Sequence, residues 1–503
     1  MINTPQYDPT IRVVDFDMEL TFYGGVNEIG GNKFLLKHKN TAVFLDFGKS
    51  FNRENKYFDF PLLRPFFIQD LKKIQAIPEI KGLYRDSHED SEVDCILLTH
   101  PHVDHFGYIS LLNSNVLVHL GEGAKTIIDI RSEIYRVGWD RKLDHITFET
   151  FRTGDERQMG DFVYTPYSVD HSVPSSYGFI IRAGDKTVLY TGDLRRHGTM
   201  KHLTEQLLRA AKKENVDVML CEGTNITQQT EDVFLKGFEH EFMRRMGKIA
   251  PERVERQCKT EADVEREMKR LVDDLDGLII VETCPADIDR IRTIWNVSKA
   301  TGRKLILDSR QAYLTYELDK RDPKVNDLPC AKDSYVYFNR IRDRDAEIEG
   351  TEAQKKWRPK FQQDLMETCD QIRMGFEGRE EVRRDASEYI FCTDNASHKL
   401  LELLEDKPFK CNFVLSKSEP FNEEMVISFD RLLHWLASYQ IKQYHQIHVS
   451  GHCGKTDLVN IVEEVNPDVL IPIHTENPKL LARFVEEEIQ EIKIPAFQEK
   501  IIV

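Results

Sequence analysis

Short apolar, β-branched and aromatic runs separated by glycine-rich turns dominate the first 200 positions. The segments LTFYGG, KFLLKHKN and TAVFLDFG between residues 18 and 48 predict three strands. Residues 93 to 120 predict a strand, a histidine-rich loop, a helix-like segment (GYISLLNS) and another strand. Residues 161 to 193 predict two strands, YGFIIRAG and KTVLYTGD, preceded by a loop around His171. We therefore expect a sheet-rich domain with interspersed helices.

The pattern changes beyond about residue 203, where charged, helix-forming stretches prevail. Residues 277 to 310 have the pattern of a strand, a helix, a glycine turn and a strand, which indicates a βαβ unit of a parallel sheet. Residues 318 to 388 are heavily charged, and we interpret them as solvated helices or an insertion. Residues 444 to 478 predict two strands, each ending in a histidine-containing loop, with a helix between them.

The length of 503 residues exceeds one ordinary core, so we expect two domains or one domain interrupted by another. Hydrophobic residues make up 40% and charged residues 31%, which is typical of a globular protein. The net charge of −16 argues mildly against broad, charge-driven binding of nucleic acid. It does not exclude such binding, because bound cations would offset metal-binding carboxylates and a basic channel can lie on an acidic protein.

The chain contains no run of roughly 20 apolar residues and no signal sequence at its start. We expect a cytoplasmic protein that does not associate with a membrane. Its nine cysteines show no CxxC spacing, which argues against a zinc ribbon and against a disulfide framework.

The strongest chemical signal is THPHVDH, residues 99 to 105, directly after an apolar strand. A loop at a strand end can direct the side chains of His100, His102, Asp104 and His105 into two adjacent pockets. Imidazole and carboxylate ligands together suit Zn²⁺ best among the common metals. Two metal ions need further ligands, and three residues that follow predicted strands are candidates: His171 in YSVDHSVP, Asp193 in VLYTGD and His474 in VLIPIHTENP.

HxHxDH followed by a later histidine and a later aspartate resembles the metallo-β-lactamase superfamily. The resemblance implies two zinc ions per chain, about 3.5 to 4 Å apart. It implies one ligand set of His100, His102 and His171, a second of Asp104, His105 and His474, and Asp193 as the bridge between them. Asp46 in VFLDFG resembles the family's early aspartate, which holds the metal-binding loop from behind.

Three further motifs resemble those of the β-CASP nucleases: Glu222 in LCEGTNI, His452 in HVSGHCG and His474 in IPIHTENP. The implied fold class is α/β, with a metallo-β-lactamase αββα sandwich interrupted by a β-CASP domain that has a parallel, Rossmann-like sheet. The expected divisions are residues 1–210 for the first part of the sandwich domain, 211–440 for the β-CASP domain with a charged insertion near 318–388, and 441–503 for the rest of the sandwich domain.

Within this group the chain is most similar to ribonuclease J, over residues 18–310 and 412–478. GGVNEIGGN, TNI after Glu222 and IHVSGHCGKTDL carry this resemblance. It implies that His448 and Ser450 help to hold a nucleotide phosphate, and Ser418 in SKSEP partly resembles the group's phosphate loop. After His105, Phe106 and Gly107 this chain has Tyr108, where the ribonuclease J group usually has a glycine. Because the chain ends soon after its final motif, we expect an archaeal-type member without the C-terminal domain, and the resemblance allows a homodimer.

The expected function is a zinc-dependent ribonuclease acting on single-stranded RNA in processing or decay. A hydroxide shared by the zinc ions would attack phosphorus, with Asp104 and Asp193 in the catalytic centre, while His452 protonates the departing oxygen and Glu222 orients His452. The family associates a histidine at its third motif with RNA rather than DNA. A small-molecule metallohydrolase, a DNA nuclease and a catalytically silent RNA-binding subunit remain alternatives, and exonuclease and endonuclease action are both open.

Overall fold

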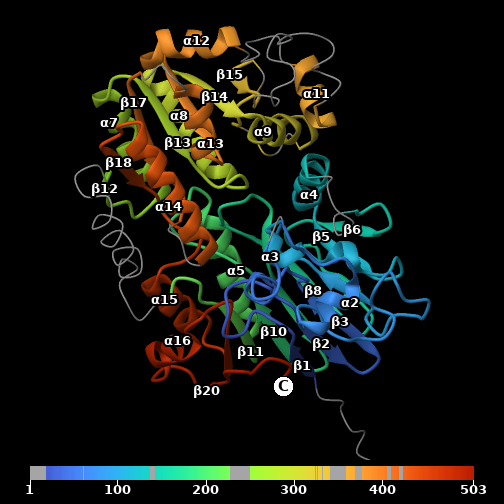
Figure 1. Cartoon of the computed structure of the whole chain (residues 1–503). Coiled ribbons are helices and arrows are strands. Elements are labelled where there is room, and N and C mark those ends of the chain that lie inside the picture. The colour runs from blue at the N-terminus through green and yellow to red at the C-terminus, as the bar shows by residue number, and fades with distance from the viewer. Residues whose placement is uncertain are drawn as a thin grey trace, which may run out of the picture.

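The computed structural model describes eleven stretches of the chain: residues 18–59, 62–135, 142–226, 250–322, 325, 327–330, 332–339, 358–368, 376–404, 409–418 and 423–503. Three seven-stranded sheets organise it. Two sheets form the lower part of the molecule and the third forms the upper part, as Figure 1 shows. None of the described helices is both long and apolar enough to cross a membrane.

The first sheet has the order β21-β1-β2-β3-β4-β5-β6. Its strands are β1 (Glu19–Phe22), β2 (Phe34–His38), β3 (Thr41–Leu45), β4 (Cys95–Leu97), β5 (Leu117–Gly121), β6 (Phe148–Phe151) and β21 (Lys500–Ile502). The three strands expected between residues 18 and 48 are present as an antiparallel meander. Because β3, β4 and β5 are parallel, the loops after β3 and β4 leave the same edge of the sheet. Asp46 and the THPHVDH loop are thereby brought together.

The second sheet has the order β20-β19-β11-β10-β9-β8-β7. Its strands are β7 (Arg157–Met159), β8 (Phe162–Val169), β9 (Ser176–Ala183), β10 (Lys186–Tyr190), β11 (Val218–Glu222), β19 (Val469–Ile473) and β20 (Glu491–Ile492). Phe22 and Phe34 of the first sheet pack with Phe179 and Tyr190 of the second in one core. Burial of these apolar faces against each other is what holds the two sheets together as a sandwich.

Helices cover the outer faces of this sandwich. Those over the first sheet are α2 (Ile68–Lys73) and α4 (Glu122–Ile134), and those over the second are α5 (Lys201–Glu214), α15 (Lys455–Val465) and α16 (Pro478–Val485). Two short helices, α1 (Phe51–Glu54) and α3 (Val103–Phe106), follow β3 and β4. The expected αββα architecture is confirmed.

The third sheet is parallel throughout, in the order β12-β18-β17-β13-β16-β14-β15. Its strands are β12 (Glu252–Arg256), β13 (Leu278–Glu282), β14 (Lys304–Asp308), β15 (Ser334–Tyr337), β16 (Tyr389–Thr393), β17 (Cys411–Leu415) and β18 (Gln443–Ile447). One face carries α7 (Glu261–Asp274), α8 (Ile288–Thr301), α9 (Ser309–Arg321) and α11 (Lys360–Thr368), and the other carries α12 (Phe376–Arg384), α13 (Ala396–Leu404) and α14 (Glu423–Ser438). The predicted βαβ unit is β13-α8-β14; the Asp287 side chain accepts a hydrogen bond from the Arg290 amide at the start of α8, and Gly302 ends the helix at φ +70°.

Local structure differs from expectation at two places. β8 was not among the expected strands. It contains Pro166, but the short β7 pairs only with Phe162–Tyr164, so Pro166 interrupts no ladder on that side. The helix-like segment after the histidines is only a 3-10 turn, Ile109–Leu111, whereas α3 forms inside the motif itself.

Sheet membership also moves the expected divisions of the chain. β11 belongs to the second sheet, so the sandwich continues past residue 210, and β18 belongs to the third sheet, past residue 440. In each case one further strand is added to an existing sheet, a pairing that the sequence pattern does not reveal. Residues 318 to 388 are not solvated throughout, because β15 pairs with β14, and Phe361 and Leu365 are buried in the core.

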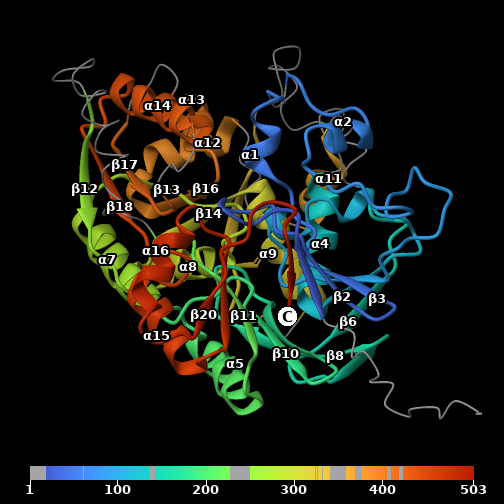
Figure 2. The same cartoon turned by 90° about the horizontal axis from the view of Figure 1, so that it is seen from below.

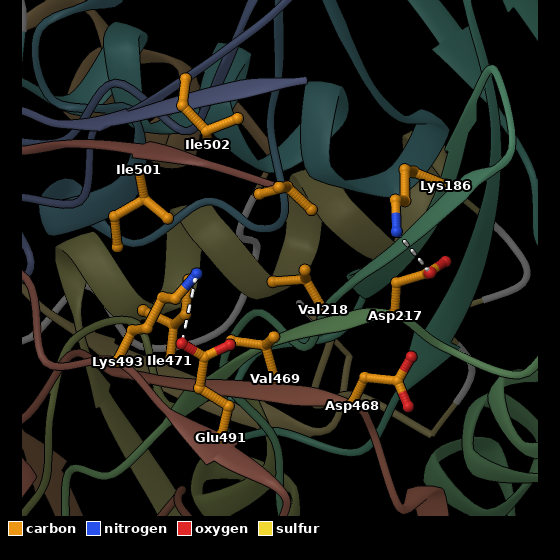
Figure 3. A pocket seen from close by; sticks show the side chains of 11 residues that line it. Lys186, Asp217, Val218, Asp468, Val469, Ile471, Glu491, Lys493, Ile501 and Ile502 are labelled. Carbon is orange, nitrogen blue, oxygen red and sulfur yellow. Dashed lines mark hydrogen bonds and ion pairs between the residues drawn. The ribbon is translucent and has the colours of Figure 1, made fainter. Parts of the chain in front are cut away.

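A cavity of about 210 Å³ lies beside β10, β11, β19 and β20, and Figure 3 shows its lining. Lys186 pairs with Asp217 at 3.2 Å, and Lys493 lies 3.6 Å from Glu491. Asp217 and Asp468 directly precede β11 and β19, whereas Glu222 and His474 end or follow them. The cavity is therefore at the opposite end of these strands from the motif residues.

A buried network of ion pairs joins the sandwich to the third sheet's helices. Arg195, which follows β10, lies 3.0 Å from Asp170 and 2.7 Å from Asp289 of α8. Its guanidinium also lies 3.5 Å from Glu261 of α7, and Arg290 of α8 binds that carboxylate at 2.9 Å. In Figure 2, which is seen from below, α7 and α8 lie on the same side of the molecule as α15.

We expect Arg195→Met to lower the free energy of unfolding by ~3–5 kcal/mol, because it leaves buried Asp170 and Asp289 without their cation. The neighbouring Arg196 is the matched control, since it pairs with the partly exposed Glu205 and Glu464. Arg196→Met should cost under ~1 kcal/mol. Urea unfolding followed by circular dichroism measures both; equal losses would contradict the importance of the buried network.

Candidate metal centre and catalytic cleft

The candidate ligands converge from both sheets of the sandwich. His100, His102, Asp104 and His105 follow β4 of the first sheet. His171, Asp193 and His474 follow β8, β10 and β19 of the second. Each half of the cluster therefore comes from a different sheet. The packing of the two sheets against each other fixes how the halves lie relative to one another.

The first donor group consists of His100, His102, His171 and Asp193, which offer ligand atoms within 4.8 Å of one another. His102 Nδ1 lies 3.0 Å from His100 Nε2 and 3.1 Å from His171 Nε2. One proton on Nδ1 cannot satisfy both nitrogens. Two nitrogens bound tetrahedrally to one zinc ion lie roughly 3.3 Å apart, so the spacing fits such an ion.

The second donor group consists of Asp104, His105, Asp193 and His474, again within 4.8 Å. His474 Nε2 lies 3.1 Å from Asp104 Oδ2, and His105 Nε2 lies 3.1 Å from Asp193 Oδ2. Asp193 belongs to both groups, and its other oxygen, Oδ1, has no hydrogen-bond partner although it is buried. A buried carboxylate oxygen without a partner is costly unless a cation or a donor occupies the space before it.

Burial keeps the imidazoles of the first group neutral. It holds the pKa of His100 and His171 well below the usual value, and it lowers the pKa of His102 to about 4. Neutral imidazole is the form that binds a metal ion. These three side chains therefore present lone pairs, not positive charge, to the space between them.

The carboxylates of the second group strongly favour a positive charge between them. Burial alone would lower the pKa of His105, but the carboxylates of Asp193 and Asp104 outweigh it and raise the pKa well above the usual value. Burial likewise works against the charged form of Asp104, but the neighbouring His105 and His474 hold its pKa below the usual value. The donor set therefore fits one or two divalent cations.

Asp46 supports the second group from behind and is fully buried. Its Oδ1 accepts a hydrogen bond from the Thr99 amide at 2.7 Å, and its Oδ2 accepts one from the Tyr190 hydroxyl at 2.6 Å. Oδ2 also lies 2.7 Å from His105 Nδ1, which leaves Nε2 of that ring for the metal group. This is the arrangement by which a carboxylate fixes the tautomer and orientation of a ligating histidine.

Glu222 and His452 form a second catalytic candidate beside the donor groups. His452 Nδ1 lies 3.1 Å from Glu222 Oε1 and 4.0 Å from Asp193 Oδ2. Burial would lower the pKa of His452, but Glu222 and Asp193 together raise it to about 9. Glu222, His452 and His474 also lie within 4.8 Å of one another, so His452 stands directly at the cluster.

The three residues expected to hold phosphate lie where β17 and β18 end. His448 Nδ1 lies 3.1 Å from the Arg290 guanidinium, and Ser450 Oγ accepts a hydrogen bond from the His452 amide at 3.2 Å. Ser418 is exposed, and the rest of its motif, Glu419 and Pro420, lies outside the described residues. His448 and Ser450 therefore lie in the same loop as His452, whereas Ser418 lies at an exposed position after β17.

Sequence reasoning missed several residues that hold the ligands in place. Thr224 Oγ1 lies 2.7 Å from His474 Nδ1 and can orient that ring, and Asn32 Nδ2 lies 3.0 Å from His105 Nε2, so this amide adjoins the nitrogen that faces the metal group. Both stand inside motifs already conspicuous in the sequence, GGVNEIGGN and EGTNI. Arg290 and Tyr190 carry no such signal, because only the fold brings them to the cleft.

Two family models match this chain. The model described as a beta-lactamase superfamily domain matches residues 74–267, and that described as a Zn-dependent metallo-hydrolase RNA specificity domain matches residues 440–496. The first contains six of the seven candidate ligands, and the second contains His452 and His474.

Similar curated proteins include ribonuclease J of Sinorhizobium meliloti, 22% identical over 480 residues that cover 93% of this chain and 70% of that protein. Ribonuclease J of Mycobacterium tuberculosis is 22% identical over 466 residues, covering 91% and 68%. Among solved structures, a protein of unknown function from Enterococcus faecalis V583 matches with a TM-score of 0.69 at 20% identity, covering 97% of this chain and 100% of that one. That likeness shows a shared fold.

The donor groups, the αββα sandwich and the inserted parallel sheet agree with these matches. The chain thus carries a beta-lactamase superfamily domain and an RNA specificity domain and is similar to ribonuclease J over most of its length, which supports a metal-dependent hydrolase of the β-CASP ribonuclease J family.

Proposed function

We propose that this chain is a zinc-dependent ribonuclease that hydrolyses RNA phosphodiester bonds by two-metal catalysis. The observation that carries the proposal is the sharing of Asp193 by two donor groups, with the Glu222–His452 pair beside them. Two adjacent divalent ions can hold the attacking and departing oxygens of an in-line displacement. The RNA specificity domain and the ribonuclease J relatives support RNA as the substrate.

In this proposal each ion has three ligands of its own and shares Asp193. His100, His102 and His171 hold one ion, and Asp104, His105 and His474 hold the other. Zinc supplies a water of lowered pKa and neutralises charge that develops on the phosphate. Asp46, through His105, keeps the second set oriented.

The chain's own proton donor is His452. Because Glu222 binds its Nδ1, the ring is held with Nε2 available to a substrate. His452 then delivers a proton to the departing ribose oxygen, and Glu222 stabilises the charged ring. A bond whose leaving group needs no proton would not depend on this step.

We also propose that His448, Ser450 and Ser418 contact a phosphate of the RNA. The Arg290 guanidinium lies 3.1 Å from His448 Nδ1, so Nε2 of that ring is the nitrogen left for a phosphate in this proposal. If this phosphate is a 5′-terminal one, the enzyme is a 5′→3′ exonuclease; an internal phosphate gives endonuclease action. A time course on RNA labelled at either end distinguishes them, since mononucleotides appear first in one case and internal fragments in the other. Cytoplasmic location and a homodimer stay predictions of the sequence.

The zinc content of single-ligand variants should reveal two sites. His102→Ala should lose one zinc ion per chain and Asp104→Ala the other, whereas Asp193→Ala should weaken both, because Asp193 is common to the two groups. All three should lose RNA cleavage. Mass spectrometry of the metals after dialysis, with circular dichroism to confirm folding, makes the measurement.

His38→Ala is the control for loss of a buried histidine elsewhere, since His38 lies in β2 and outside the donor groups. It should keep both ions. An unaltered zinc content in His102→Ala and Asp104→Ala would refute the two-site assignment.

Replacement of His452 should separate chemistry from binding. His452→Gln should lower kcat on RNA by about 10²–10⁴-fold with little change in affinity, because it removes the proton donor. Hydrolysis of bis(p-nitrophenyl) phosphate should fall far less, since p-nitrophenolate departs without a proton. Glu222→Gln should also lower kcat on RNA more than it lowers hydrolysis of bis(p-nitrophenyl) phosphate, but by a smaller factor than His452→Gln.

Single-turnover kinetics on both substrates test this role. His434→Gln on α14 is the control, because His434 is largely exposed and bound to Asp430 on its own helix. Equal losses on RNA and on the nitrophenyl ester would show that His452 acts in binding or in holding the loop, and not as the proton donor.

A further inference from the structure

The segment between β3 and α2 exposes an unusual amount of apolar surface. Six of the ten large hydrophobic side chains exposed in the described part of the chain belong to it: Phe51, Tyr57, Leu62, Leu63, Phe66 and Phe67. Tyr57, Phe66 and Phe67 are 60%, 68% and 71% exposed. Concentrated exposure of this kind on a water-facing surface indicates a binding site.

The backbone that carries these rings is held in place. The Phe66 and Phe67 amides both donate to Asp70 Oδ2, at 2.8 and 2.9 Å, and the Leu63 amide donates to the Asp59 carbonyl at 2.7 Å. Ile68 and Leu71 of α2 then anchor the segment in the core. The two phenylalanine rings therefore project from a fixed turn directly before α2, and Figure 2 labels α1 and α2, the helices at either end of the segment.

The same segment begins in contact with the metal-binding loop. The Phe47 amide donates to the His105 carbonyl at 2.8 Å, and the Lys49 amide donates to the Val103 carbonyl at 3.0 Å. Gly48 passes so close to Asp104 that an added Cβ would lie 1.6 Å from the Asp104 carbonyl oxygen. Phe51 follows two residues beyond this contact with the metal-binding loop.

Basic residues alternate with the aromatic ones although the chain as a whole carries a charge of −16. Lys49, Arg53, Lys56 and Arg64 lie in this stretch, and Lys56 and Arg64 are exposed. Of the acidic residues described in this stretch, Glu54 is bound by Lys49 at 2.7 Å and by the Tyr108 hydroxyl at 2.5 Å, so that Lys49 and Glu54 offset each other, and Asp59 is exposed. Aromatic rings interspersed with cations are the composition that binds single-stranded nucleic acid, by stacking on bases and by attracting phosphates.

We propose that residues 49–59 and 62–67 form a stacking surface along which a single strand of RNA runs into the metal cleft. The inference rests on the proposed ribonuclease activity for the identity of the ligand. A single strand is required for two reasons: duplex bases are already stacked on one another, and His100, His171 and Asp193 are too deeply buried for a duplex to reach. Phe66 and Phe67 hold bases distant from the scissile bond, and Phe51 lies nearer to it.

The test measures RNA affinity without cleavage, in the Asp104→Ala background. A fluorescein-labelled 20-nucleotide oligouridine and a duplex of equal length are titrated by anisotropy. Adding Phe66→Ala and Phe67→Ala should weaken binding of the single strand on the order of tenfold for each ring, with the duplex unaffected. The paired control, Leu401→Ala with Ile502→Ala, removes exposed apolar side chains from α13 and β21 and should change nothing.

A spectroscopic readout separates stacking from a structural effect. Phe67→Trp should retain affinity, and its fluorescence should be quenched when oligouridine binds. Unchanged affinity in the double alanine variant, or an unquenched tryptophan, would overturn the proposal. Light scattering tests the other occupant, a second copy of the chain: a dimer that the alanine variant converts to monomer, with RNA affinity intact, would also overturn it.

These experiments distinguish failure of the stacking surface from failure of the proposed ribonuclease activity. If the wild-type chain binds oligouridine through Phe66 and Phe67 but cleaves no RNA with zinc bound, the stacking surface stands and the ribonuclease assignment fails. If it cleaves RNA and the alanine variants cleave and bind as well as wild type, the assignment stands and the stacking surface fails.

Discussion

The fold holds buried imidazoles and carboxylates so close together that they would repel one another without a positive charge between them. The rest of the structure depends on this constraint. His102 Nδ1 faces two other ring nitrogens at 3.0 and 3.1 Å, and the Asp193 carboxylate lies within 4.0 Å of five histidines. Lone pairs at such distances repel one another in a medium of low dielectric constant. The sandwich must therefore supply enough packing energy to hold them, and a bound cation in turn contributes to stability. The placement of ligands on loops that follow buried strands of two packed sheets meets this requirement.

Two left-handed backbone positions lie in the same place. Asp46 and His474 adopt this conformation with φ of +58° and +50°, which is uncommon for residues other than glycine. Each is fixed by several contacts: Asp46 by Thr99, Tyr190 and His105, and His474 by Thr224 and by its own amide, which donates to the Gly25 carbonyl at 2.7 Å. The surrounding hydrogen bonds thus offset the local cost. They fix the direction in which each side chain approaches the metal groups.

In the proposed mechanism the third sheet contributes through the loop that carries His452. Residues 448 to 454 connect β18 of that sheet to α15 of the sandwich, so His452 is placed correctly only when the two parts are docked. The network of Arg195, Glu261, Asp289 and Arg290 fixes this docking, and Arg290 also donates to the Val449 carbonyl at 3.2 Å. His197 Nε2 lies 2.8 Å from the Ser450 carbonyl and holds the same loop from the sandwich side. Buried charges of this kind specify one relative orientation of the two parts, because any other orientation leaves them unpaired.

The sequence by itself determined the ligand types, the strand-then-loop context of each ligand and the βαβ character of the inserted part, because alternation, glycine turns and HxHxDH spacing are local properties. It also pointed to Glu222 and His452 through motifs. It did not determine that β11 and β18 extend neighbouring sheets, that β15 gives residues 318 to 388 a buried share, or that Tyr190, Arg195 and Arg290 serve the site. Those features arise from contacts between residues distant in the chain, and a buried arginine has the same local pattern as an exposed one. Only tertiary packing decides which side chains lose their water and must find a partner.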